Sequence, residues 1–127
     1  MHFPENILYT KDHEWLKITD GFAFIGITDF AQKELGDIVY VEIETVDETL
    51  KQNEVFGTIE AVKTVSDLFM PLGGVIIEIN PKIISNPELV NNDPYGEGWL
   101  IKIKASDKVG SANLLNSQKY KALLGLN

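Results

Sequence analysis

Residues 54–71 decide the fold of this chain, and they read Glu-Val-Phe-Gly-Thr-Ile-Glu-Ala-Val-Lys-Thr-Val-Ser-Asp-Leu-Phe-Met-Pro. Two runs rich in β-branched and aromatic residues, 55–62 and 65–70, lie on either side of Lys63. Side chains of the first run alternate with a period of two, which is typical of a β-strand. The segment therefore predicts a β-hairpin with Lys63 at its tip, although neither Gly nor Pro marks the turn.

Lys63 admits two interpretations from the residues alone. A lysine at the end of a strand often does no more than keep a sheet edge soluble. Alternatively, its primary amine can form an amide with a carboxylic acid, which is how the carrier cofactors lipoamide and biotin are joined to proteins. Composition does not decide between the two, but the residues around Lys63 bear on the choice.

The segment Glu60-Ala-Val-Lys-Thr-Val-Ser-Asp67 resembles the lipoyl-lysine segment of the glycine cleavage H-protein family. Further signatures of that family are matched in the right order over nearly the whole chain. Several long motifs in order are far more specific than one short pattern. These matching segments are Tyr9–Trp15, Gly26–Gln32, Leu35–Val39, Asn86–Val90 and Asp93–Leu100.

The resemblance implies a carrier protein that is not itself an enzyme. In this family a lipoate-attaching enzyme joins lipoate to the lysine that corresponds to Lys63. The arm takes the aminomethyl group of glycine from the pyridoxal-phosphate-dependent glycine decarboxylase to the tetrahydrofolate-dependent aminomethyltransferase. Dihydrolipoyl dehydrogenase then reoxidises the dithiol. We expect the same cofactor, attached to Lys63, and the same partners for this chain.

Other functions stay open at this point. Some H-like proteins relay lipoyl or octanoyl groups to other lipoyl domains, and they use the same lysine. A binding module whose lysine is never modified would be marked by loss of the lysine or of its acids, and neither is lost here. A biotin carrier places Met on both sides of the lysine, whereas Val62 and Thr64 flank Lys63. An independent enzyme has no support, because the sequence shows no nucleophile–base pair or phosphate loop.

Carboxylates are the expected lining of the cleft in which a loaded arm rests, because the amine of its cargo is cationic near neutral pH. The resemblance places that cleft near the opening signature and the residues just after the lysine. Asp12, Glu14 and Asp67 are the acids there, and Glu14 and Asp67 are the first candidates. Glu60 is a candidate for recognition by the lipoate-attaching enzyme. Each acid could instead be a solvated surface charge, worth little to stability.

Composition narrows the classes of partner. The 127 residues suit one domain, 1–127, with a modest core. Eleven basic and nineteen acidic residues give a net charge of −8, which disfavours nucleic-acid and anionic-membrane partners. There is no cysteine, and the two histidines do not indicate a metal site. We expect a monomer that is bacterial-like and cytoplasmic; a mitochondrial location would require a presequence to have been removed.

Short strands separated by turn signals predict a mostly β protein with small helices. The resemblance implies a flattened lipoyl/biotinyl-type β-sandwich, or barrel-sandwich hybrid. Thr28 is expected to cap a helix over 29–34, and Ser117 to cap a C-terminal helix over 118–124. Residues 86–98 should be an ordered loop with one helical turn. Beyond the hairpin, strands are expected at 14–18, 22–27, 37–43, 75–79 and 99–104, with a polar connection at 46–50.

Several side chains are expected to have structural roles only. His13 is more simply a structural residue than a ligand. In strand 37–43, alternation puts Val39, Val41 and Ile43 on one face. Asn80-Pro81 is expected to end the strand before it. The side chains expected in the core are Trp15, Phe24, Trp99 and Ile101.

Overall fold

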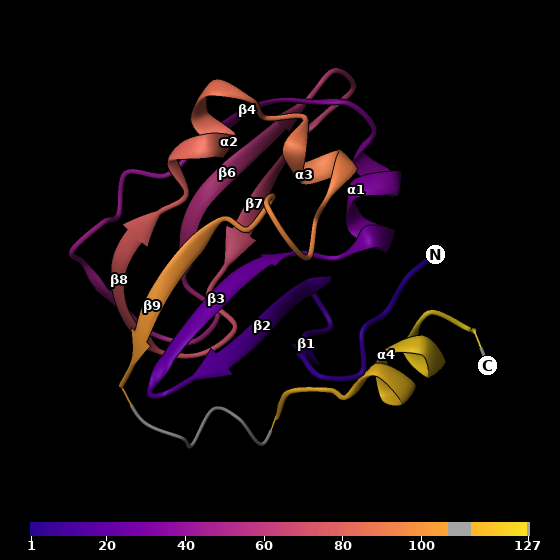
Figure 1. Ribbon diagram of the computed structural model, residues 1–127, viewed down its shortest axis with the longest axis horizontal. Coiled ribbons are helices and arrows are strands. Elements are labelled where there is room, and N and C mark those ends of the chain that lie inside the picture. Colours follow the sequence, from indigo (N-terminus) through magenta and orange to yellow (C-terminus); the bar gives the residue numbers. More distant parts are fainter. Residues whose placement is uncertain (107–112, 127) are drawn as a thin grey trace.

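The computed structural model describes residues 1–106 and 113–126. Within them the chain forms two antiparallel sheets and four short α-helices (Figure 1). The larger sheet has the strand order β1-β2-β3-β9-β8-β5, and the smaller has the order β4-β6-β7. The strands are β1 Leu8–Tyr9, β2 Glu14–Thr19, β3 Phe22–Ile27, β4 Ile38–Glu42, β5 Thr49–Leu50, β6 Val55–Ala61, β7 Val65–Phe69, β8 Gly74–Ile79 and β9 Ile101–Ala105. The helices are α1 Asp29–Leu35, α2 Pro81–Ser85, α3 Leu89–Asn92 and α4 Ser117–Leu123.

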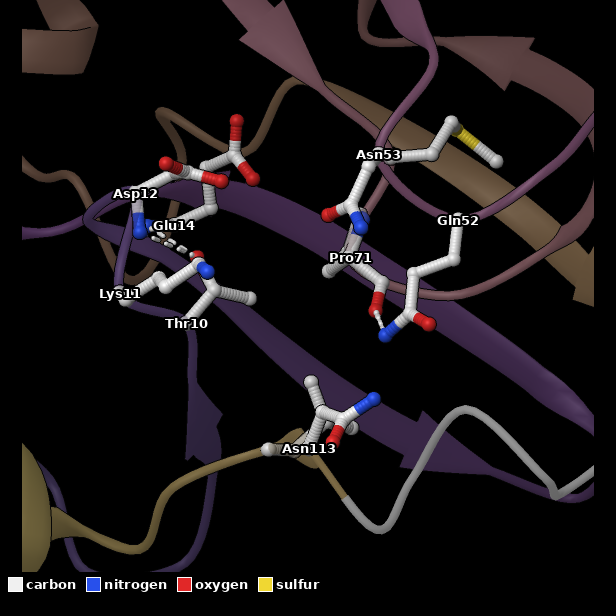
Figure 2. Close-up of a pocket in the computed structure, with 10 residues that line it drawn as sticks. Thr10, Lys11, Asp12, Glu14, Gln52, Asn53, Pro71 and Asn113 are labelled. Carbon is white, nitrogen blue, oxygen red and sulfur yellow. Dashed lines mark hydrogen bonds between the residues drawn. The ribbon is translucent and has the colours of Figure 1, made fainter.

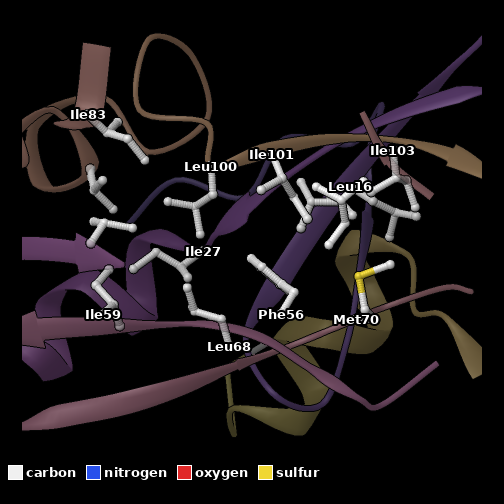
Figure 3. Packing of buried hydrophobic residues seen from close by; sticks show 14 of the residues in the cluster. Leu16, Ile27, Phe56, Ile59, Leu68, Met70, Ile83, Leu100, Ile101 and Ile103 are labelled. Atoms are coloured by element: carbon white, nitrogen blue, oxygen red, sulfur yellow. The ribbon is translucent and has the colours of Figure 1, made fainter. Parts of the chain in front are cut away.

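The two sheets enclose a common hydrophobic core (Figure 3). Leu16, Ile25 and Ile101 come from the larger sheet, and Phe56 and Ile59 come from the smaller one. All five are almost completely buried. Burial of this apolar area is the main force that holds the sheets together. The predicted fold class, a mostly β flattened sandwich with short helices, is confirmed.

The predicted hairpin forms between β6 and β7. Glu60 pairs with Val65 in the antiparallel ladder, and Thr58 pairs with Asp67. The predicted period of two holds at Ile59 and Ala61, which face the core on either side of the exposed Glu60. It fails at the start of β6, where the register shifts between Val55 and Gly57, so that Phe56 is buried and Val55 is exposed. The turn at residues 62–64 projects at the top of the view in Figure 1, beside α1 and α3.

A second buried cluster covers the other face of the larger sheet near the start of β2. Trp15 is its centre, and its indole Nε1–H donates to the carbonyl of Pro94 at 2.9 Å. The ring crosses β3 so closely that a Cβ at Gly26 would lie 2.6 Å from Nε1, so only glycine fits there. The cluster joins the N-terminal segment to α4 through Phe3, Ile7, Tyr9, Trp15 and Tyr120.

Two of the four expected core side chains lie elsewhere. Trp15 and Ile101 are buried as predicted, at 2% and 0% exposure. Phe24 and Trp99 are only partly buried, and their rings pack edge to face, with centroids 5.1 Å apart, at the margin of the second cluster. They lie on the outer side of the sandwich, which the hydrophobicity of an aromatic residue alone does not reveal.

The face of β4 was predicted incorrectly at one residue. Val41 is buried, at 2% exposure, whereas Val39 is 49% exposed. The register against β6 shifts between Ile38 and Tyr40, as in a β-bulge. An extra residue in one strand reverses the alternation on one side of it, so Val39 turns outward.

Helix boundaries depart from the prediction at two capping residues. Thr28 caps α1 as expected, because its hydroxyl accepts from the N–H of Ala31 at 3.2 Å. Asn80 also ends β8, but with Pro81 at the first helical position it starts α2, a helix that the prediction missed. Asn116 rather than Ser117 caps α4, since its side chain accepts from the N–H of Lys119.

The remaining differences are small. The loop at 86–98 contains the expected helical turn, α3. The two-residue strands β1 and β5 were not predicted, and β5 lies in the segment expected to be only a polar connection. The last predicted strand begins at Ile101 rather than Trp99.

Candidate functional site

Lys63 lies exposed in the turn of the β6–β7 hairpin. The Ala61 N–H donates to the carbonyl of Thr64 at 2.8 Å and closes the turn, while the Val62 N–H donates to the carbonyl of Asp37 at 3.0 Å. These bonds tie the turn both to itself and to the chain that leaves α1. The amine is thus held at the surface by a stiff support.

Gly36 lies directly beneath the Lys63 side chain. A Cβ at Gly36 would approach Lys63 Cε to 3.1 Å and Nζ to 3.5 Å. Gly36 also ends α1 with a φ of 80°, a backbone region that glycine adopts without strain. One glycine therefore both ends the helix and leaves room for the lysine stem.

A cavity of about 310 Å³ lies at the opposite end of the hairpin (Figure 2). On one side are Asp12, in the connection from β1 to β2, and Glu14, the first residue of β2. On the other are Asn53 and Pro71, which flank the base of the hairpin. The segment before α4 contributes Asn113. Its lining residues are Thr10, Lys11, Asp12, Glu14, Gln52, Asn53, Met70, Pro71, Asn113 and Leu114.

Glu14 is the unusual residue of this cavity. Its side chain is only 2% exposed, and its Oε2 accepts from the Phe69 N–H at 2.7 Å. Among the described residues its Oε1, which is also buried, has no hydrogen-bond partner. Burial raises the pKa of Glu14 to about 8; the Phe69 N–H opposes this, the charge of Asp12 adds to it, and the nearby Thr10 hydroxyl opposes it to a smaller extent. Burial thus favours the neutral carboxyl near neutral pH.

The backbone between β1 and β2 aims Asp12 and Glu14 at the cavity. The Thr10 hydroxyl accepts from the N–H groups of both residues, at 3.2 Å each. Between them His13 has a φ of 66° and its N–H donates to the carbonyl of Thr10. This left-handed residue turns the chain sharply and sends the imidazole away from the cavity, toward Tyr120.

The structure separates the other two acids from this pair. Asp67 is exposed on β7, two residues before Phe69, and is not among the residues that line the cavity. Glu60 is exposed on the outer face of β6, paired with Tyr40 and Val65. Of the acids singled out from the sequence, Asp12 and Glu14 therefore share the cavity, whereas Asp67 and Glu60 lie on the hairpin outside it.

Lys63 and the cavity lie a strand length apart. From Val65 to Met70 the chain makes five steps, which at about 3.3 Å per residue is roughly 17 Å. Met70 lines the cavity and Lys63 lies at the tip. A lysine side chain alone does not span that distance, so only a long extension on its amine could bring a group from the tip to Glu14.

Residues that sequence reasoning missed lie on segments remote from the acids. Asn53 is one of them, with a φ of 73° and an N–H that donates to the carbonyl of Met70 at 2.8 Å. Asparagine often takes this conformation, so the turn itself was predictable, but its place opposite Glu14 was not. Gln52, Pro71 and Asn113 reach the cavity only through the tertiary fold.

A shallower hollow of about 420 Å³ lies over the second cluster, between Trp15, Phe24 and Trp99. Its acids already have partners within the chain. Asp93 accepts from the N–H of Glu97, and the Glu97 carboxylate forms an ion pair with Lys82. The cavity at Glu14 is therefore the better candidate for a cationic group, because only there is a buried carboxylate oxygen left without a described partner.

The sequence matches the model of one protein family, Glycine cleavage H-protein, over residues 7–125. The chain belongs to this family. Glycine cleavage system H proteins of Bacteroides thetaiotaomicron and Bacteroides fragilis are each 56% identical to it over 124 residues, covering 98% of both chains. That of Halothermothrix orenii is 50% identical over 120 residues, covering 94% of both.

A solved structure agrees with the family assignment. The crystal structure of a glycine cleavage system H protein from Mycobacterium marinum superposes with a TM-score of 0.90 at 38% identity. The match covers 98% of this chain and 100% of that one. The resemblance inferred from the motifs is thereby confirmed as family membership, which implies the role of a lipoyl carrier.

Two other features of the described residues bear on function. Within 1–106 and 113–126, no group of three or more His, Asp or Glu side chains is placed to hold a metal ion. None of the helices in those ranges has the length and apolar character needed to cross a membrane.

Proposed function

We propose that this chain is the lipoyl-carrying shuttle of glycine cleavage, with lipoate joined to Lys63 through an amide. The observation that carries the proposal is the exposed Lys63 at the tip of a stiff hairpin, in a chain whose family match spans 7–125. A primary amine in an exposed turn is accessible to an attaching enzyme. Its stem lies over Gly36, where any larger residue would crowd it.

The residues present fit a lipoyl arm at both of its ends. Lys63 supplies the amine, and the cavity supplies a buried carboxylate with one oxygen unpartnered among the described residues. When bound, lipoate would supply the sulfur chemistry that takes up and releases the aminomethyl cargo. All that this chain must do is anchor, orient and shield that cargo.

Glu14 would bind the ammonium end of the cargo. Near neutral pH its carboxyl holds a proton, and among the described residues the other charges that line the cavity are those of Lys11 and Asp12. An entering ammonium group favours the anion, so Glu14 would give its proton to water and pair with the cation. The surrounding Met70, Pro71 and Leu114 would limit the access of water to a labile adduct.

The roles assigned to the other acids follow from their places. Asp12 borders the cavity and would add negative potential at its mouth. Asp67 and Glu60, exposed on the hairpin near Lys63, would contact partners or the base of the arm. The proposed partners are glycine decarboxylase, aminomethyltransferase, dihydrolipoyl dehydrogenase and the lipoate-attaching enzyme. The chain would catalyse none of their reactions alone.

Glycine–bicarbonate exchange by purified glycine decarboxylase tests the proposal. The lipoylated chain should stimulate the exchange, and a Lys63→Arg variant prepared in the same cells should not. A matched Lys51→Arg variant, which changes another exposed lysine, should behave as the unaltered chain. Failure of the lipoylated chain to stimulate exchange would overturn glycine cleavage as its role and would favour the relay of lipoyl groups.

A further inference from the structure

Tyr120 of the C-terminal helix connects α4 to the segment that carries the cavity acids. We propose that Tyr120 is a positioning residue, whose hydroxyl holds His13 and thereby aims Asp12 and Glu14 into the cavity. This role matters for the carrier only if the proposed function holds. The contact between Tyr120 and His13 itself does not depend on lipoate. It gives α4, which lies outside the sandwich, a role in the site (Figure 1).

The Tyr120 side chain is held on all sides. It has 0% exposure, its ring stacks on that of Tyr9 with centroids 4.7 Å apart and planes 4° from parallel, and Phe3 packs against its edge. Its hydroxyl lies 2.9 Å from His13 Nδ1 and 2.8 Å from Thr28 Oγ1. The group thus bridges the segment before β2 and the start of α1.

One arrangement of hydrogens satisfies the whole bridge. In it, the Thr28 hydroxyl accepts from the Ala31 N–H and donates to the Tyr120 oxygen, and the Tyr120 O–H donates to an unprotonated His13 Nδ1. This direction requires a neutral imidazole. The pKa of His13 is lowered by burial, the largest cause, against opposing effects of the Asp12 and Glu34 charges.

His13 is the residue through which Tyr120 acts on the cavity. It stands between Asp12 and Glu14 with a positive φ, a conformation that costs free energy in a residue with a Cβ. Its carbonyl accepts from the Thr28 N–H at 3.0 Å, and its ring packs on Phe30 with centroids 4.8 Å apart. Because these contacts fix the His13 ring on the side away from the cavity, Asp12 and Glu14 on either side of it face the cavity.

The segment before α4 supports the same assignment. Tyr9 and Leu115 exchange two backbone hydrogen bonds, of 2.8 and 2.7 Å, which fix the chain that leads into the helix. Asn113 and Leu114, just before it, line the cavity itself. One short stretch therefore borders the cavity and, through Tyr120, orients its acids.

A pair of stacked tyrosines provides the experiment and its control. Tyr120→Phe and Tyr9→Phe each remove one buried hydroxyl and keep the ring stack, but the Tyr9 hydroxyl donates to the carbonyl of Pro4, away from the acids. The pH titration of the Glu14 carboxyl, followed by carbon-13 NMR in the unmodified full chain, is the readout. Within the part of the chain that the structure describes, the ionisable groups beside Glu14 are those of Lys11, Asp12 and His13.

In the unaltered chain the Glu14 titration should have its midpoint near pH 8, and Tyr9→Phe should leave it there. Tyr120→Phe should lower the midpoint by about one unit, a tenfold change in proton affinity, because a loosened segment admits water to the carboxyl. A midpoint unchanged in Tyr120→Phe would overturn the proposal, as would equal shifts in both variants.

His13→Asn supplies a second route if Tyr120→Phe folds poorly, since asparagine tolerates a positive φ. It should shift the Glu14 midpoint as Tyr120→Phe does, and the double variant should shift it no further, because both act through one link. Additive shifts would contradict that link. The titration needs no lipoate, so it decides the positioning role even if the shuttle function fails.

Discussion

The carboxyl of Glu14 is titratable and almost inaccessible to water. We therefore expect the free energy of unfolding to depend on pH through this residue. Its ordinary pKa of 4.5 rises to about 8 in the fold. Between these two pH values the folded chain binds more protons at this residue than the unfolded chain does. The free energy of unfolding therefore falls as pH rises through this window, by an amount set by the shift.

The variant Glu14→Gln removes this pH dependence. Relative to the unaltered chain, its free energy of unfolding should rise by roughly 1–4 kcal/mol between pH 4.5 and pH 8. Urea unfolding at the two pH values measures the difference. Asp12→Asn removes a charge that raises the pKa of Glu14, so it should reduce this pH dependence without abolishing it. A constant difference between Glu14→Gln and the unaltered chain would show that Glu14 is ionised throughout.

The elements around Lys63 are joined by one side chain, that of Asn91 in α3. Its Oδ1 accepts from the Ile38 N–H at 2.9 Å, and its Nδ2 donates to the carbonyl of Gly36 at 2.9 Å and to Gln32 Oε1 at 3.1 Å. Asn91 thereby fixes the end of α1 and the start of β4. These are the segments that support the hairpin tip.

Asn91→Ala should lower the free energy of unfolding by about 1–3 kcal/mol, since backbone groups lose their partners. Asn92→Ala, one residue along the same helix and exposed, should cost less than about 0.5 kcal/mol. Chemical denaturation of both variants measures the contrast. Equal losses would show that the helix itself, rather than the Asn91 bridge, is what matters.

The cap of α4 can be tested in the same way. Asn116→Ala should lower the free energy of unfolding by about 1 kcal/mol, because the Lys119 N–H loses its acceptor. Helix signals in circular dichroism should weaken, and the Tyr120 bridge should loosen with them. Were Ser117→Ala the more damaging change, the cap expected from the sequence would be the true one.

At the scale of the whole molecule, the net charge of −8 should govern how partners approach. Exposed acids near the hairpin tip include Asp37, Glu60 and Asp67. Where these acids dock on a basic face of glycine decarboxylase, salt screens the attraction, so the apparent KM for the lipoylated chain should rise several-fold between about 20 and about 200 mM salt. Steady-state kinetics at fixed glycine measure this. A KM indifferent to salt would mean that apolar contacts dominate docking.

Local sequence patterns predicted most of the strands and helices. The predictions that failed did so for a common reason. The alternation in 55–62 predicted β6 because half of its side chains must face one core. The alternation failed at Val39 in β4 and at Val55 and Phe56 in β6, since a bulge depends on how the strands pair and not on the sequence of one strand. Asn80-Pro81 ends a strand and starts a helix with the same two residues, and only the first was predicted.

The candidate site, too, was predicted where local motifs mark its residues and missed where only tertiary contacts bring them together. Lys63 and Glu14 could be singled out from motifs, but the burial that makes Glu14 unusual arises where β2 meets β7, 55 residues further along the chain. Asn53 and Asn113 reach the cavity from other segments again. No local pattern records that Tyr120 touches His13, 107 residues away. Contacts of this range are a property of the packed molecule.

The central claim is that one amine, that of Lys63, carries the lipoyl arm, and the intact mass of the protein tests it most directly. The chain produced in lipoate-replete cells should gain the mass of one lipoyl group. Lys51→Arg should keep that gain, and Lys63→Arg should lose it completely. A Lys63→Arg protein that still carries the added mass would contradict the account.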